Sequence, residues 1–218
     1  MDLAFPLRTL SPGLDSAVLH VLAATESGLS ATQIARLASR GTRVGQVPVL
    51  NRLVEHGLVL AEPANRGFLY RLNREHVLAP AVLHAVRARS TVLQRLRDAA
   101  RDLGPDLVHV SVFGSFARGQ AGPASDIDLL IVRSARARAD LDEQWSLQVQ
   151  ALADRVLAWT GNRMEYVVLT TDRLAVVVAA DEPIVRSWLV DSLAVHGPPL
   201  SELVDGMTND PVVRRAHP

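Results

Sequence analysis

The chain contains no cysteine and no lysine. Without cysteine it has no disulfide, no thiolate nucleophile and no Cys-ligated zinc. All 23 basic residues are arginine, so the lysine required by a Walker A phosphate loop or by a kinase is missing. These two absences exclude P-loop NTPases, protein kinases and thiol enzymes.

Long apolar runs are also absent. No stretch approaches the roughly 20 apolar residues that a membrane span needs, and residues 1–10 lack the basic and apolar regions of a secretory signal. Hydrophobic residues still make up 48% of the 218 residues, which is enough for a buried core. We expect a cytoplasmic protein with no membrane partner, large enough for one medium domain or two small ones.

The net charge of zero hides an uneven distribution. Residues 1–102 carry 13 Arg against 8 Asp and Glu, whereas residues 103–218 carry 10 Arg against 15. A basic half could bind a polyanion and an acidic half could hold cations, so the charge pattern predicts two functions. Random surface charge is the alternative explanation for an imbalance of this size.

The first half reads as short helices followed by a β-hairpin. Ser30 precedes a helix over 31–38 and has Gln33 three residues on, a capping-box pattern. Pro48 is placed in the first turn of a further helix, which Gly57 ends.

The hairpin signal comes next. Apolar strands at 58–60 and 68–72 flank a turn at 65–67. Residues 74–103 are expected to be mostly helical, with Pro80 as a start or kink.

The second half alternates between strand and helix patterns. Strands are expected at 107–113, 127–132 and 164–169. Helices are expected at 115–118, 140–160, 172–180 and 183–196. This alternation predicts an α/β (α+β) fold class.

A turn between the first of these strands and the next helix has the chemistry of an anion site. Gly114 and Ser115 bring backbone N–H groups and a hydroxyl to a helix N-terminus. Gly114 suits this place because a Cβ would obstruct an approaching phosphate.

Three acidic residues lie where later strands begin. Asp126 and Asp128 have the spacing that puts two side chains on one face of a strand, and two adjacent carboxylates repel each other unless a cation neutralises them. Oxygen ligands of this type suit Mg²⁺ or Mn²⁺. Glu165 is the acid inside a later apolar strand, and we expect it to be a metal ligand or the general base. The alternative is a Glu165 that is simply exposed on an edge strand.

The segments GSFARG (114–119) and SDIDLLIV (125–132) resemble the signature of the polymerase-beta-like nucleotidyltransferase superfamily. The resemblance is particularly to minimal nucleotidyltransferases related to kanamycin nucleotidyltransferase, and it covers roughly residues 105–200. It implies a short mixed sheet, with Gly114 and Ser115 on the nucleotide phosphates and Mg²⁺ on Asp126 and Asp128. The third acid of the family is usually Asp, whereas the matching strand here offers Glu165.

The resemblance implies an NTP substrate, with ATP expected, and an acceptor that is a partner toxin protein, a tRNA or a small molecule such as an aminoglycoside. We expect Arg118 and Ser125 beside the nucleotide as well. The alternative is a regulator or antitoxin whose transferase domain only binds nucleotide.

The first half resembles a winged helix-turn-helix domain, on LSATQIARLASRG (29–41), VPVLNRLVEHGLV (47–59) and NRGFLYRLN (65–73). Such domains place a recognition helix in the DNA major groove. We therefore expect the following residues to contact DNA: Arg43, Gln46, Asn51, Arg52 and Arg66. The alternative is a protein-binding or dimerisation module, and DNA binding would favour a homodimer.

These patterns divide the chain into four parts. They are a winged helix-turn-helix domain at 1–73, a linking helix at 74–103, a nucleotidyltransferase domain at 104–204 and a flexible tail at 205–218.

Overall fold

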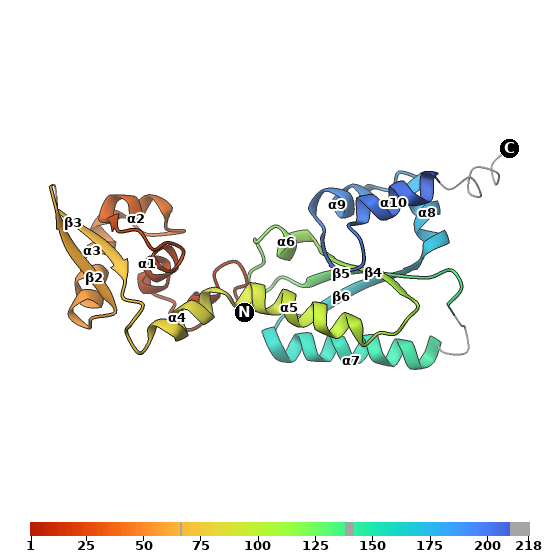
Figure 1. Ribbon diagram of the computed structural model, residues 1–218, viewed down its shortest axis with the longest axis horizontal. Helices are drawn as coiled ribbons and strands as arrows, with labels where there is room; N and C mark the ends of the chain where they lie inside the picture. Colours follow the sequence, from red (N-terminus) through yellow and green to blue (C-terminus); the bar gives the residue numbers. More distant parts are fainter. Residues whose placement is uncertain (66, 138–141, 210–218) are drawn as a thin grey trace. The chain divides into compact units, whose positions relative to one another are not determined.

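The computed structural model describes residues 1–65, 67–137 and 142–209 (Figure 1). The chain separates into two compact units. One unit contains residue 2 and residues 4–89, and the other contains residues 1 and 3 together with the chain from residue 90 onward.

The unit formed by residues 4–89 packs helices against a small antiparallel sheet. Its elements are a 3-10 turn η1 (Pro6–Thr9), α1 (Leu14–Ala23), β1 (Leu29–Ser30), α2 (Ala31–Leu37), α3 (Arg43–Glu55), β2 (Val59–Ala64), β3 (Gly67–Leu72) and α4 (Ala79–Val86). The strand order is β1-β3-β2, and the hairpin pairs Val59 with Leu72. Apolar side chains from α1, α3 and both hairpin strands form its core.

The start of α2 is as expected, but the start of α3 is not. The Ser30 hydroxyl accepts the Gln33 N–H and the Gln33 side chain accepts the Ser30 N–H, which completes the capping box. The expected start of α3 at Pro48 is wrong, because the Thr42 hydroxyl caps the helix by accepting the Gly45 N–H. Pro48 therefore lies inside α3, where it has no N–H to donate to the preceding turn.

The second unit is a four-stranded mixed sheet with helices on both faces. Its elements are α5 (Ala88–Arg101), β4 (Leu107–Phe113), α6 (Gly114–Ala117), β5 (Ile127–Arg133), α7 (Asp142–Thr160), β6 (Met164–Thr170), α8 (Thr171–Ala179), α9 (Pro183–Asp191), β7 (Leu193–His196) and α10 (Leu200–Asn209). The strand order is β6-β5-β4-β7, with β5 and β6 parallel. Helices α5 and α7 cover one face and α8, α9 and α10 cover the other (Figure 1).

Two expectations for the end of the chain are corrected by the structure. The expected helix 183–196 is instead α9 followed by β7, which pairs with β4 through Val112 and Leu193. Residues 205–209, expected in a flexible tail, belong to α10, whose Leu200 and Val204 are buried against the sheet. The rest of the expected tail, 210–218, lies outside the described residues, as does the expected helix start at Asp140.

None of the helices within the described residues combines the length and the apolar character needed to cross a membrane.

Candidate active site

The predicted phosphate turn is packed tightly against one of the predicted metal acids. Gly114 follows β4 directly and has φ +67°, a left-handed conformation. A Cβ at this position would lie 2.6 Å from Oδ2 of Asp128. Glycine is therefore needed for two reasons, because any side chain would meet both backbone strain and the carboxylate.

Strand register brings two of the predicted acids side by side. Asp128 is the partner of Phe113 on β4 and of Glu165 on β6, and adjacent strands lie about 4.8 Å apart. Asp126 precedes β5 by one residue and is exposed, as is Glu165, whereas Asp128 is half-buried. The three acids therefore belong to one end of the sheet, beside the turn at Gly114.

The ionised form of Asp128 is in an unfavourable environment at this end of the sheet. Partial burial raises the pKa of Asp128 above its usual value of 3.8, and the negative charges of Asp126 and Glu165 raise it further. The nearby Arg118 acts in the opposite direction and lowers it. The carboxylates of Asp126 and Glu165 therefore each repel Asp128, and a divalent cation would relieve that repulsion.

The donor chemistry fits a hard divalent cation, but the side chains do not form a ready-made cage. Among the described residues, no three Asp, Glu, His or Cys side chains converge closely enough to hold a metal ion. Magnesium sites commonly use one or two carboxylates and complete the shell with substrate phosphates and water. The carboxylates at Asp126, Asp128 and Glu165 fit a site of that kind.

Arg118, predicted to bind nucleotide, is held by two partners. Its Nη1 donates to Oδ2 of Asp191 at 2.5 Å, and its Nε donates to Oε1 of Gln120 at 3.2 Å. Asp191 is the last residue of α9, and one residue separates it from β7, the strand that pairs with β4. The guanidinium therefore lies in a defined position near the acids.

Ser125, also predicted beside the nucleotide, has hydrogen bonds within its own loop and to Asn162. Its hydroxyl accepts the Gly122 N–H at 3.0 Å, and its carbonyl accepts from Nδ2 of Asn162 at 2.8 Å. Sequence reasoning missed both Asn162 and Asp191. Gly161-Asn162 reads as an ordinary turn and Asp191 as a solvated helix end, because the contacts of each are formed with distant parts of the chain.

The predicted DNA-contacting residues share one unit but differ in exposure. Arg43, Asn51 and Arg52 are exposed on α3, and Arg52 is paired with Asp15 of α1. The expectation for Gln46 is wrong in this structure, since its side chain is fully buried and Nε2 donates to the Arg40 carbonyl at 3.0 Å. A buried side chain that satisfies a backbone carbonyl cannot reach a base edge.

Arg66, the remaining predicted DNA contact, lies outside the described residues.

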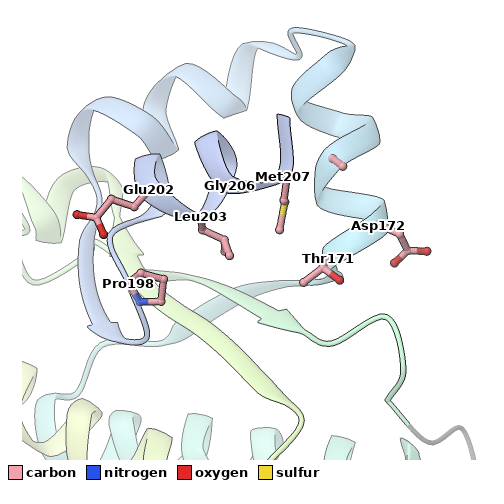
Figure 2. A pocket seen from close by; sticks show the side chains of 8 residues that line it. Thr171, Asp172, Pro198, Glu202, Leu203, Gly206 and Met207 are labelled. Atoms are coloured by element: carbon pink, nitrogen blue, oxygen red, sulfur yellow. The ribbon is translucent and has the colours of Figure 1, made fainter. Parts of the chain in front are cut away.

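A cavity of about 490 Å³ lies away from the acids, between α8 and α10. Figure 2 shows Leu203 and Met207 directed into it, with Asp172 and Glu202 at opposite sides. Thr171, which also lines it, follows β6 at the end opposite to Glu165. None of the residues lining this cavity belongs to the predicted site.

Comparison with known proteins gives a match for part of the second unit. Residues 93–161 match the family model described as Nucleotidyltransferase domain. This range contains the turn at Gly114 and the acids Asp126 and Asp128, and it ends shortly before Glu165. No significant match was found among curated proteins.

Several solved structures are similar over about half of the chain. A toxin–antitoxin complex with AMP-PNP has 14% identity and a TM-score of 0.35, covering 57% of this chain and 93% of that one. A tri-AMPylated HEPN toxin of Shewanella oneidensis in complex with MNT antitoxin has 12% identity and a TM-score of 0.33, covering 59% and 93%. A protein from Sulfolobus solfataricus described as a predicted nucleotidyltransferase has 20% identity and a TM-score of 0.29, covering 50% and 83%.

Proposed function

We propose, from the nucleotidyltransferase domain that residues 93–161 match, that this chain transfers a nucleoside monophosphate group from an NTP to an acceptor hydroxyl. The acceptor oxygen forms a bond to the α-phosphorus, and the bond from that phosphorus to the bridging oxygen breaks. Pyrophosphate leaves with the bonding electrons, and the hydroxyl proton passes to a base. The products are the nucleotidylated acceptor and pyrophosphate.

The observation that carries this proposal is the packing of the glycine turn against the acids. Gly114 approaches Asp128 so closely that a Cβ would overlap with its carboxylate, and Asp128 faces Glu165 across the sheet. Phosphate bound at Gly114 and Ser115 would therefore lie beside the carboxylates. A glycine turn and an acid pair with unrelated roles would not be expected to lie in contact with each other.

Each side chain has a role in this proposal. Asp126 and Asp128 would hold Mg²⁺ or Mn²⁺ with Glu165, and the bound ion supplies charge neutralisation at the phosphates. Gly114 and Ser115 provide backbone N–H groups to the triphosphate. Glu165 is either a third ligand or the base that receives the hydroxyl proton.

Direct labelling tests the activity. Purified full-length protein is incubated with Mg²⁺, cell extract and each of the four NTPs, labelled at the α-phosphate. We expect label to move onto an acceptor with at least one NTP, ATP being expected. Protease, ribonuclease and size filtration then separate a protein acceptor, such as a toxin, from tRNA or a small molecule. Folded protein that binds none of the four nucleotides with Mg²⁺ in a calorimeter rejects the proposal.

A substitution at Glu165 tests whether this residue is the base or a third metal ligand. Glu165→Gln removes the base while keeping a side chain of the same shape, so we expect turnover to be lost and nucleotide affinity to change little. Asp126→Asn should weaken binding of the metal–nucleotide complex as well. Turnover of the Glu165→Gln protein at the wild-type rate rejects Glu165 as a catalytic residue.

A second function, DNA binding, is supported by the unit formed by residues 4–89. The order α1, β1, α2, α3 and a β2–β3 hairpin, with a β1-β3-β2 sheet, supports the expected winged helix-turn-helix. Arg43 and Asn51 are exposed on α3, the helix that would enter the major groove. The chain would then be a DNA-binding transferase or, if turnover is absent, a nucleotide-binding regulator or antitoxin.

A gel shift on DNA from the chain's own upstream region tests this function. Arg43→Ala and Asn51→Ala should each weaken specific binding by about 1–3 kcal/mol if they contact base edges. Arg186→Ala, at an exposed arginine of the other unit, is the matched control and should bind as the wild type does. Binding by all of these variants at the wild-type level would reject Arg43 and Asn51 as base contacts, and no DNA binding by the wild type would leave dimerisation or protein binding as the role of the unit.

A further inference from the structure

Asn162 connects the loop that carries Asp126 to the turn that precedes β6. The residue is buried, with 2% of its surface exposed. Nδ2 donates to the carbonyl oxygens of Gly122 at 3.1 Å and Ser125 at 2.8 Å, and Oδ1 accepts from the Met1 nitrogen at 2.7 Å. A buried amide whose donor and acceptor are both used is costly to replace, because its partners would be left without hydrogen bonds.

The backbone is held on both sides of Asp126. The carbonyl of Ser125 accepts from Asn162, and the N–H of Ile127 donates to the carbonyl of Arg163 at 2.8 Å. Two consecutive residues of one turn therefore fix the two peptide groups that flank the acid. The direction in which the Asp126 side chain leaves the loop depends on these two contacts.

The turn containing Asn162 is itself rigid. The Thr160 hydroxyl donates to the Val156 carbonyl at 2.7 Å and accepts the Asn162 N–H at 3.0 Å. Thr160 is 5% exposed. Strand β6 begins directly after this turn and carries Glu165. One turn thus sets the position of Glu165 and, through Asn162, that of Asp126.

The first residues of the chain complete this arrangement. The Leu3 N–H donates to the Ala121 carbonyl at 2.9 Å, at the start of the same loop. The Met1 nitrogen donates to the Thr160 carbonyl at 2.7 Å as well as to Asn162. Leu3 is fully buried in the core of this unit, so the loop and the turn are linked by contacts that do not depend on exposed side chains.

We propose that Asn162 is a positioning residue for the candidate metal site, holding Asp126 near Asp128 so that their carboxylates can bind the divalent cation together with substrate phosphates. This inference rests on the proposed nucleotidyl transfer and names a residue that supports the same site. Asn162 acts through the backbone of residues 122–125 and contacts neither substrate nor metal. Its loss should therefore weaken metal binding before it affects the chemical step.

The test variant is Asn162→Asp, which keeps the size and the oxygen that accepts from Met1 but removes the N–H groups facing two carbonyls. The concentration of Mg²⁺ for half-maximal turnover should rise about tenfold or more, as for other supports of metal ligands. Saturating Mg²⁺ should restore most of kcat, and KM for the NTP at saturating Mg²⁺ should stay near the wild-type value. Calorimetry with Mn²⁺ alone should show the same loss of affinity without any turnover.

The matched control is Asn73→Asp. Nδ2 of Asn73 donates to the Gly57 carbonyl at 2.9 Å and Oδ1 accepts the Glu75 N–H, so the change removes a similar amide contact in the other unit. Its metal dependence should equal that of the wild type. Thermal unfolding of both variants checks that each is folded at the assay temperature.

If Asn162→Asp does not fold, Asn162→Ala serves in its place, because it removes the donor without adding a charge beside two carbonyls. Wild-type Mn²⁺ affinity in a folded Asn162 variant overturns the proposal, and so does a loss of turnover that no Mg²⁺ concentration relieves while Mn²⁺ affinity is unchanged. Failure of the proposed function looks different, since the wild type itself would transfer nothing. The Mn²⁺ measurement still decides the role of Asn162 in that case.

Discussion

Gly114 and Asp128 are packed so closely that the glycine cannot gain a side chain unless the carboxylate moves. A Cβ on Gly114 would lie 2.6 Å from Oδ2 of Asp128, well inside van der Waals contact. The proposed phosphate turn is therefore in direct contact with a carboxylate of the proposed metal site. A substitution in the turn should change metal binding.

Gly114→Ala should lower the free energy of unfolding and, in addition, strongly reduce Mg²⁺-dependent turnover. The left-handed φ of +67° costs an alanine about 1–2 kcal/mol, and the methyl group would also displace Asp128. Gly104→Ala is the control, because Gly104 has φ +93° but no atom within 4 Å of a Cβ. Urea unfolding should show a loss of stability in both variants, the larger one in Gly114→Ala because of the added overlap with Asp128. Mg²⁺-dependent turnover should fall at least tenfold in Gly114→Ala alone. Equal activities would show that Asp128 tolerates the displacement.

Asp128→Asn should stabilise the metal-free protein at neutral pH. The pKa of Asp128 is raised by burial and by Asp126 and Glu165, so its ionised form opposes folding there. In the window above 3.8, the folded protein binds more protons than the unfolded chain, and wild-type stability falls as pH rises through that window. The gain in Tm should thus be largest near pH 7 and shrink as the pH is lowered toward 3.8.

The same variant should lose this advantage when ligand is present. A ligand at 100 times its Kd stabilises the folded state by about 2.7 kcal/mol, and Asp128→Asn should receive little of this from Mg²⁺ with an NTP. Differential scanning fluorimetry with and without Mg²⁺ and nucleotide measures both effects. An Asp128→Asn protein that is less stable than the wild type without metal would show that the carboxylate has a structural role.

Asp191→Asn should raise KM for the NTP several-fold with a smaller effect on kcat. Asp191 holds Nη1 of Arg118, and an amide in its place would leave the guanidinium less fixed near the phosphates. Asp181→Asn is the control, since it breaks the exposed pair with Arg186 in the same region. Asp191→Glu should restore part of the affinity. If Asp191→Asn lowers KM instead, the pair competes with nucleotide for Arg118.

His109 should make the second unit sensitive to mild acid. It is fully buried on β4, and burial lowers its pKa below 6.5 despite the contact of Nδ1 with the Pro198 carbonyl. Because the unfolded chain binds the proton first as pH falls below 6.5, stability is complete above that pH and is lost below it. The slope from this residue is at most about 1.4 kcal/mol per pH unit.

His109→Asn should reduce the dependence of stability on pH. It should also lower stability at neutral pH, because it replaces a buried imidazole. Urea midpoints at pH 7.5 and 5.5 measure the slope. His20 also has a pKa lowered by burial, but it lies in the other unit, so part of the acid sensitivity should remain in the variant. An unchanged slope in His109→Asn would assign all of it elsewhere.

Local chemistry made much of the fold predictable. The capping box at Ser30 and Gln33 needs only residues three apart, and the alternation of strands and helices gave the α/β class. The bounds of β4 were predicted to the residue, because Gly114 ends an apolar run. The acids could be predicted to share one site from the two-residue spacing of Asp126 and Asp128, the turn at Gly114 and the later apolar strand that carries Glu165.

Some expectations were wrong because of local contacts, and one was wrong because of pairing with a distant strand. Pro48 was placed at the start of α3, but Thr42 caps that helix one turn earlier. Residues 193–196 have a helical pattern in sequence, yet they pair with β4, whose edge needs a partner. Gln46 was expected to face DNA, whereas the carbonyl of Arg40 draws it inward.

The sequence by itself determined the class of fold and the residue types of the candidate site, since both follow from local periodicity and spacing. Tertiary structure alone decided that Glu165 faces Asp128, that Asp191 holds Arg118, and that Asn162 supports the loop of Asp126. The physical reason is that hydrogen bonds and charges act through space, over a few ångströms, and bring together residues separated by up to 73 positions in these three pairs.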